Sequence, residues 1–310
     1  MSALAPRLEH GLNEARILIL GVQVLLGFHL RAPLEPGYER LSPAAHGLKL
    51  GGLVLLLVAT ALLMAPAAYH RIVDAGHASG RVHRFATWTM AVALVPIGLA
   101  LAGDFYVALE GAAGAATSAL AAGGLAATAA GLWYALPLSL RGPGPRRAAE
   151  GQEREVTPLE QRVEQVLTEI RMVLPGVQAL LGFGFAATLM DAFPRLPGAS
   201  QALHLAGVAC VALATILLMT PAARHRLVEG GEDTEAFHRF ASRLLLAAMV
   251  PFALGIAAEF AVVVRRITDS VALAVAGAVL AGLLFFGCWF GVGAWARVRA
   301  AAGSDRRRAA

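Results

Sequence analysis

Long apolar runs alternate with short polar connections along the whole chain. Each run holds about 20 mostly uncharged residues, the length that a helix needs to cross the hydrocarbon core of a bilayer. We expect eight membrane-spanning helices. They cover residues 15–34, 48–68, 85–109, 115–138, 172–189, 203–223, 240–264 and 271–296. The pattern therefore predicts an all-α integral membrane fold.

The second half of the chain repeats the first at a constant offset of 155 residues. The segment Met64-Ala-Pro-Ala-Ala-Tyr-His-Arg71 returns as Met219-Thr-Pro-Ala-Ala-Arg-His-Arg226, and His83-Arg-Phe-Ala86 returns as His238-Arg-Phe-Ala241. One offset that holds over several helices indicates an internal repeat. Because each half has an even number of spans, both halves have the same orientation. We therefore expect two parallel four-helix repeats, related by an axis along the membrane normal.

The repeat also gives the domain boundaries. We expect a first four-helix repeat at 1–140, a cytoplasmic linker at 141–157, a second repeat at 158–298 and a basic tail at 299–310. Glycine and proline end the fourth run. Thr157-Pro-Leu-Glu160 has the pattern of a capping box with proline at the first helical position, which predicts a helix start near 158.

Composition and charge agree with this fold. The 310 residues are 57% hydrophobic and 15% charged, against about 45–50% and 25% in soluble domains, and the mean hydropathy is +0.64. The net charge of +5 comes from arginines at the ends of the apolar runs. Most of these arginines fall on one side, which the positive-inside rule makes cytoplasmic, although Arg265 and Arg266 fall on the other. We expect both termini in the cytoplasm and a lipid bilayer, rather than nucleic acid, as partner.

Motifs for catalysis and cofactor binding are missing from the sequence. Cys210 and Cys288 form no CxxC or zinc spacing. Nucleotide-binding loops, nucleophile elbows and zincin motifs do not occur. We expect a protein that is not an enzyme and that holds no cofactor.

Polar residues that both halves keep at the predicted cytoplasmic rim are the first candidate site. They are Glu14, Arg16, His70, Arg71, His83 and Arg84, repeated as Glu169, Arg171, His225, Arg226, His238 and Arg239. In each half we expect the glutamate to lie close to the basic residues of the hairpin that joins the second and third spans. Headgroup anchoring and helix capping explain such residues. Paired histidines with a carboxylate also fit proton or metal binding, which the sequence leaves open.

A second candidate group lies inside the membrane. Gln23 shares a helical face with Arg16 and Gly27, and Gln178 repeats this arrangement. An amide in lipid needs a partner or water, so each glutamine either bonds a neighbouring helix or lines a pathway. Asp104 and Glu259 lie roughly 31 Å beyond the rim histidines, about one hydrocarbon thickness, and mark the outer mouth.

Small residues are concentrated in the fourth and eighth runs. The stripes are Gly111-Ala-Ala-Gly114, Gly123-Gly124 and Gly287-Cys-Trp-Phe-Gly291. Small residues let helices approach closely in lipid. These faces are expected either to pack the halves together or to form a homo-oligomer.

The conserved motifs of the two halves resemble a known family. Glu-x-Arg, Gly-Val-Gln, Ala-Pro-Ala-Ala-x-His-Arg and His-Arg-Phe-Ala are similar to those of a bacterial family of small multi-pass membrane proteins of unknown function. Each half covers one such unit, although the first half has Leu20 where the second has Pro175. The resemblance implies a four-helix unit in the bacterial inner membrane and supplies no activity.

Three classes of function fit these features. Transport or permeation of an ion or small solute is the leading expectation, because polar residues lie inside a duplicated bundle. The alternative is a non-transporting membrane scaffold or pH-responsive sensor that uses the rim. The third is a b-type haem or metal redox protein. All the rim histidines lie on one side of the membrane, which does not suit electron transfer across it.

Overall fold

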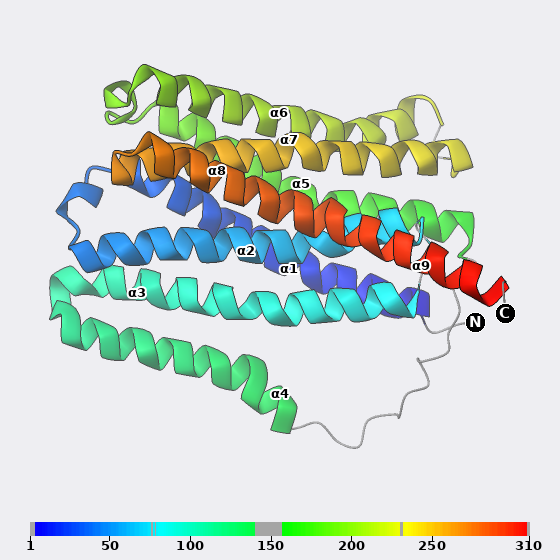
Figure 1. The fold of residues 1–310 in the computed structure, drawn as a ribbon, viewed down its shortest axis with the longest axis horizontal. Helices are drawn as coiled ribbons and strands as arrows, with labels where there is room; N and C mark the ends of the chain where they lie inside the picture. The colour runs from blue at the N-terminus through cyan, green and yellow to red at the C-terminus, as the bar shows by residue number, and fades with distance from the viewer. Residues whose placement is uncertain (1–3, 76, 78, 140–156, 230–231, 309–310) are drawn as a thin grey trace.

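A computed structural model describes residues 4–75, 77, 79–139, 157–229 and 232–308, and all regular elements in these residues are helical. The helices run alongside one another in a single bundle (Figure 1). The main helices are α1 (Leu4–Arg31), α2 (Pro43–Val73), α3 (Gly80–Ala130), α4 (Leu136–Ser139), α5 (Leu159–Thr188), α6 (Gly198–Leu227), α7 (Glu235–Thr268), α8 (Val271–Phe286) and α9 (Val292–Arg308). Two π-helical turns, η3 (Gly131–Ala135) and η5 (Gly287–Gly291), join α3 to α4 and α8 to α9. Three short 3-10 turns, η1 (Ala32–Leu34), η2 (Tyr38–Arg40) and η4 (Phe193–Arg195), lie in the connections.

Within the described residues, seven helical segments are long and apolar enough to cross a membrane. The third segment, Gly80–Ser139, has 60 residues. Its backbone leaves the helical region at Gly114, where φ is +76°, a conformation that glycine adopts without a side-chain clash. The chain reverses direction there and returns alongside the first part of α3 (Figure 1). The Tyr134 hydroxyl donates to the Ala91 carbonyl at 2.5 Å across this hairpin.

Side-chain caps begin most of the helices that follow a loop. Ser42, Ser79, Thr234 and Ser270 each accept a hydrogen bond from a backbone N–H in the first turn of α2, α3, α7 and α8. The capping box expected at the start of α5 is wrong. Pro158 occupies the N-cap position, which provides no side-chain bond, and not the first helical position predicted for it.

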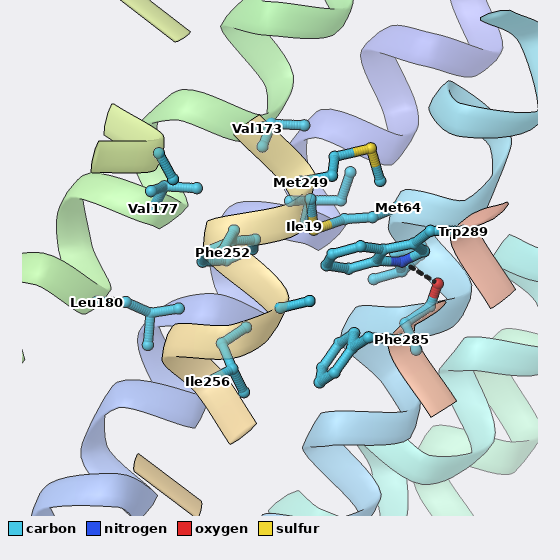
Figure 2. Packing of buried hydrophobic residues seen from close by; sticks show 14 of the residues in the cluster. Ile19, Met64, Val173, Val177, Leu180, Met249, Phe252, Ile256, Phe285 and Trp289 are labelled. Atoms are coloured by element: carbon cyan, nitrogen blue, oxygen red, sulfur yellow. Dashed lines mark hydrogen bonds between the residues drawn. The ribbon is translucent and has the colours of Figure 1, made fainter. Parts of the chain in front are cut away.

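Apolar side chains from both halves form one core at the centre of the bundle (Figure 2). Trp289 of η5 is fully buried, and its Nε1 donates to the Ala61 carbonyl of α2 at 3.0 Å. Phe252 of α7 stacks on the Trp289 ring at 6.0 Å between ring centroids. The π-helical turn thus inserts an aromatic residue of the second half into the first half.

The last span and its counterpart in the first half make different contacts. Helices α8 and α9 pack against α2, where Ile72 contacts Gly293. The counterpart, residues 115–139, lies beside the first part of α3 at the edge of the bundle (Figure 1). A Cβ on Gly123 or Gly124 would meet no atom within 4 Å. In the eighth run, the segment Gly287–Gly291 contacts the first half through Trp289, whereas a Cβ on Gly287 would meet no atom within 4 Å.

The ends of α2, α6 and α9 and the starts of α1, α3, α5 and α7 lie at the same end of the bundle (Figure 1). We call this the basic end, because the basic rim residues are located there. The expected linker at 141–157 lies outside the described residues except for Thr157, and the side chains of 303–310 in the basic tail lie outside them too.

Candidate functional site

A buried group of charged residues joins the two halves at the basic end. Glu169 of α5 accepts hydrogen bonds from His70 Nδ1 at 2.7 Å and from Arg71 Nε at 2.6 Å, both on α2. These three side chains are at most 1% exposed. Because α2 belongs to the first half and α5 to the second, this carboxylate pairs across the two halves. The sequence had predicted a pairing within each half.

The helical geometry of α2 explains this pairing. Successive residues of a helix point about 100° apart, so His70 and Arg71 reach the two oxygens of Glu169 from different sides. His70 Nε2 lies 3.2 Å from the His77 carbonyl oxygen. Both ring nitrogens of His70 therefore face oxygen atoms, which fixes the orientation of the ring.

Residues of α5 and α7 extend the network. Arg71 Nη1 lies 3.1 Å from His238 Nε2 and 3.3 Å from Ser242 Oγ. Arg162 Nη2 lies 3.1 Å from His238 Nδ1, and Arg162 Nη1 donates to Glu235 at 2.6 Å. We call the residues Glu169, His70, Arg71, His238, Arg162 and Glu235 the interhalf cluster. It ties α2, α5 and α7 together at the basic end.

Most of the other rim residues do not join this cluster. Arg16, Arg84, Arg171 and Arg226 are exposed, and His83 is half-buried. His225 pairs with Asp233 at 3.5 Å instead. Arg239 is 62% exposed and lies 3.9 Å from Glu235, at the edge of the cluster. The side chain of Glu14 lies outside the described part of the structure.

The two intramembrane glutamines have different surroundings. Gln23 is fully buried, its Nε2 contacts Met64 Sδ at 3.6 Å, and its Oε1 has no hydrogen-bond partner in the described residues. A Cβ on Gly176 would lie 1.3 Å from Gln23 Oε1, so the amide occupies the space above that glycine. Gln178 is exposed and lies 3.9 Å from Met219 Sδ. Gln23 is thus a packing residue between α1 and α5, whereas Gln178 lies on the surface.

Carboxylates and histidines also pair at the opposite end of the bundle. Asp104 Oδ1 lies 2.7 Å from Lys49 Nζ and 3.3 Å from His29 Nε2. In the second half, His204 Nδ1 lies 2.8 Å from Glu259 Oε2. Asp104 therefore pairs with a lysine, and both carboxylates predicted to mark the outer mouth lie close to an imidazole nitrogen.

A narrow cavity adjoins the pair in the second half. It has a volume of about 30 Å³ and is lined by apolar residues of both halves together with His204, Glu259, Arg31 and Arg266. Glu259 Oε1 is buried beside it and has no partner among the described residues. A cavity of this volume holds one or two water molecules and nothing larger.

Tyr38, in the connection between α1 and α2 at this end, is also buried. Its ring packs edge-on against His46 at 4.6 Å between ring centroids. Burial raises the pKa of the Tyr38 hydroxyl above its usual value of 10.0, although Arg266 lowers it in part. Tyr38 thus packs against the bundle, although its neighbours Glu39 and Arg40 are exposed.

Several residues of these two sites were missed in the sequence. Arg162 has a counterpart in Arg7 at the same offset of 155 residues, and this repetition could have identified it. Lys49 and His204 are also counterparts, but they differ in type, so the identical residues shared by the two halves do not include them. His29 and Glu235 have the counterparts Gly184 and Gly80, and no pattern indicated them.

Metal binding finds no support in the described part of the chain, because no group of three or more histidine, cysteine, aspartate or glutamate residues is arranged to hold an ion.

Comparison with known proteins gives a family but no activity. The sequence matches a family of unknown function, DUF6328, twice, over residues 5–137 and 152–293. The two matches coincide with the two halves of the repeat. No curated protein and no solved structure matches the chain. The chain therefore belongs to the DUF6328 family and contains two copies of its unit in tandem.

Proposed function

We propose that the protein is an integral membrane protein with eight spans, arranged as two parallel four-helix repeats. The segment Gly80–Ser139 would be about 90 Å long as one helix, about three times the hydrocarbon thickness. Its reversal at Gly114 divides it into two antiparallel spans of suitable length. The eight spans would then lie across the bilayer with the basic end in the cytoplasm of a bacterial cell.

The topology has a direct test. Cys210 and Cys288 are first replaced by serine. Single cysteines at the exposed positions Gly111 and Arg226 are then labelled in intact cells with a thiol reagent that does not cross the membrane. We expect label at position 111 and none at 226. Labelling after cell lysis serves as the control that both cysteines are reactive. Label at position 226 in intact cells, or label at neither position, would then contradict this orientation.

We further propose that the protein is a non-enzymatic, non-transporting membrane scaffold or sensor that acts through its basic end. The packing of Gln23 carries this proposal. The amide is fully buried, and its Oε1 occupies the space above Gly176 between α1 and α5. The interhalf cluster also joins the two halves at the basic end through buried hydrogen bonds from His70 and Arg71 to Glu169.

A flux assay tests this function. Proteoliposomes containing the full chain are loaded with a pH-sensitive dye and a potassium-sensitive dye, and ion gradients are imposed. We expect the same leak as in protein-free vesicles. Flux that saturates and that Gln23→Leu abolishes, while the exposed Gln178→Leu control leaves it intact, would favour transport and overturn the scaffold function.

One observation keeps permeation as a second candidate. The cavity beside His204 holds an unpartnered carboxylate oxygen of Glu259 between the halves. Its size fits water or a proton and not an organic solute. Proton flux that Glu259→Gln abolishes in the same vesicles would support this candidate.

A further inference from the structure

A second cavity opens at the basic end, next to the interhalf cluster. It has a volume of about 330 Å³, which is within the range of small-molecule binding sites. Most of its lining residues lie on one face of α7, and Arg71 of α2 and Arg162 of α5 also line it. Four arginines line it: Arg71, Arg162, Arg239 and Arg243.

The cavity contains more hydrogen-bond donors than acceptors. Arg71 is buried, and its Nη2 has no partner in the described residues; the buried Nε of Arg162 has none either. His238 lies between the two guanidinium groups, with Arg71 Nη1 at one ring nitrogen and Arg162 Nη2 at the other. A neutral imidazole accepts at one nitrogen and a protonated one at neither. At least one more arginine N–H is therefore left without an acceptor.

The charges around the cavity also favour an anionic ligand. Glu235 is the single carboxylate that lines the cavity, and Glu169 lies behind Arg71. Four arginines thus face two carboxylates. Arg243 has no carboxylate partner among the described residues, and Arg239 has only the 3.9 Å contact with Glu235. Phosphate groups satisfy such a site, because their oxygens carry negative charge and accept several hydrogen bonds from guanidinium groups.

We propose that this cavity is a binding site for a phosphate group, carried either by a soluble anion or by a lipid headgroup. The proposal deepens the scaffold function, on which it rests, by naming the chemistry that the basic end recognises. Arg239 and Arg243 provide the exposed charges that the phosphate meets first. Arg71 and Arg162 also line the cavity, and each carries a buried nitrogen without a hydrogen-bond partner in the described residues.

The α7 face of the site has no equivalent in the first half. The residues at the equivalent positions of the first half are Trp88 in place of Arg243 and Gly80 in place of Glu235. Arg84 is the counterpart of Arg239, is exposed at the same end and does not line the cavity. Arg84 therefore gives a matched control, with the same side chain on an equivalent helix.

The test is calorimetric titration of the purified full chain in a neutral maltoside detergent. The probes are sodium pyrophosphate, dihexanoyl phosphatidic acid and, as a zwitterionic comparison, dihexanoyl phosphatidylcholine. We expect saturable binding of at least one of the two anionic probes. The double variant Arg239→Gln/Arg243→Gln should weaken it by about tenfold or more, and Arg84→Gln should leave it unchanged. Both replaced arginines are exposed, so the double variant should fold, which circular dichroism checks.

Each outcome decides the question. Binding of pyrophosphate that the double variant weakens indicates a soluble anion, and binding of phosphatidic acid alone indicates a lipid headgroup. No binding of either anionic probe, equal binding by wild type and double variant, or equal heats from sodium chloride at matched ionic strength would overturn the proposal. None of these results depends on the flux measurement, so the scaffold function can fail while the phosphate site stands.

Discussion

Replacement of Glu169 by glutamine tests the interhalf cluster directly. Glu169→Gln keeps the shape of the side chain but removes its charge. The Arg71 guanidinium, at most 1% exposed, then has no carboxylate beside it. Loss of one partner from a buried ion pair costs about 3–5 kcal/mol, because the other charge stays buried and uncompensated. The two hydrogen bonds that Glu169 accepts, from His70 and Arg71, give a similar figure at about 1.5–3 kcal/mol for each bond to a charged group.

The free energy of unfolding can be measured by titration with dodecyl sulfate in maltoside micelles, followed by far-ultraviolet circular dichroism. We expect Glu169→Gln and Arg71→Gln each to lower it by about 3–5 kcal/mol. The double variant should cost clearly less than the sum of the two, because the residues interact. Arg226 is the exposed counterpart of Arg71, so Arg226→Gln should change the free energy by less than about 0.5 kcal/mol.

A small effect would refute this reasoning. If Glu169→Gln costs under about 1 kcal/mol, as for an exposed ion pair, water must reach the cluster and the two halves are held by apolar packing alone. Strict additivity of the two single variants would refute the pairing across the halves.

Two further predictions concern the packing between the halves. Gly176→Ala should lower the free energy of unfolding by about 1–3 kcal/mol, because the new Cβ would overlap Gln23. Gly21→Ala, at the equivalent open position, should lower it by less than about 0.5 kcal/mol. Equal losses for the two variants would contradict the close contact between Gln23 and Gly176. Trp289→Phe should cost about 1–3 kcal/mol through the lost hydrogen bond and the space left in the core. The exposed Trp295→Phe is its control in the same titration, and a larger loss for the control would show that the Trp289 ring does not join the halves.

The helices and the repeat could be predicted from the sequence because both depend on local pattern. Apolar runs of the length of a span become helices wherever they occur, and the ends of α2 and α7 follow the predicted spans to within several residues. The constant offset between the halves agrees with the two family matches. The kept polar residues indicated the basic end as a candidate site, since glutamate, histidine and arginine at one level can pair.

Which of these residues meet was decided by the tertiary structure. The sequence treats Glu14 and Glu169, or Gln23 and Gln178, as equivalent, but the two halves do not pack symmetrically. The last span lies against α2, whereas its counterpart lies at the edge of the bundle, and so one copy of a residue is buried while the other is exposed. Pairing of Glu169 with Arg71 depends on how the bundle brings the start of α5 near the end of α2, because these residues are 98 positions apart in the sequence. The sequence determined the helices, the repeat and the residues available for chemistry, and the asymmetric packing of two similar halves decided which of them form a site.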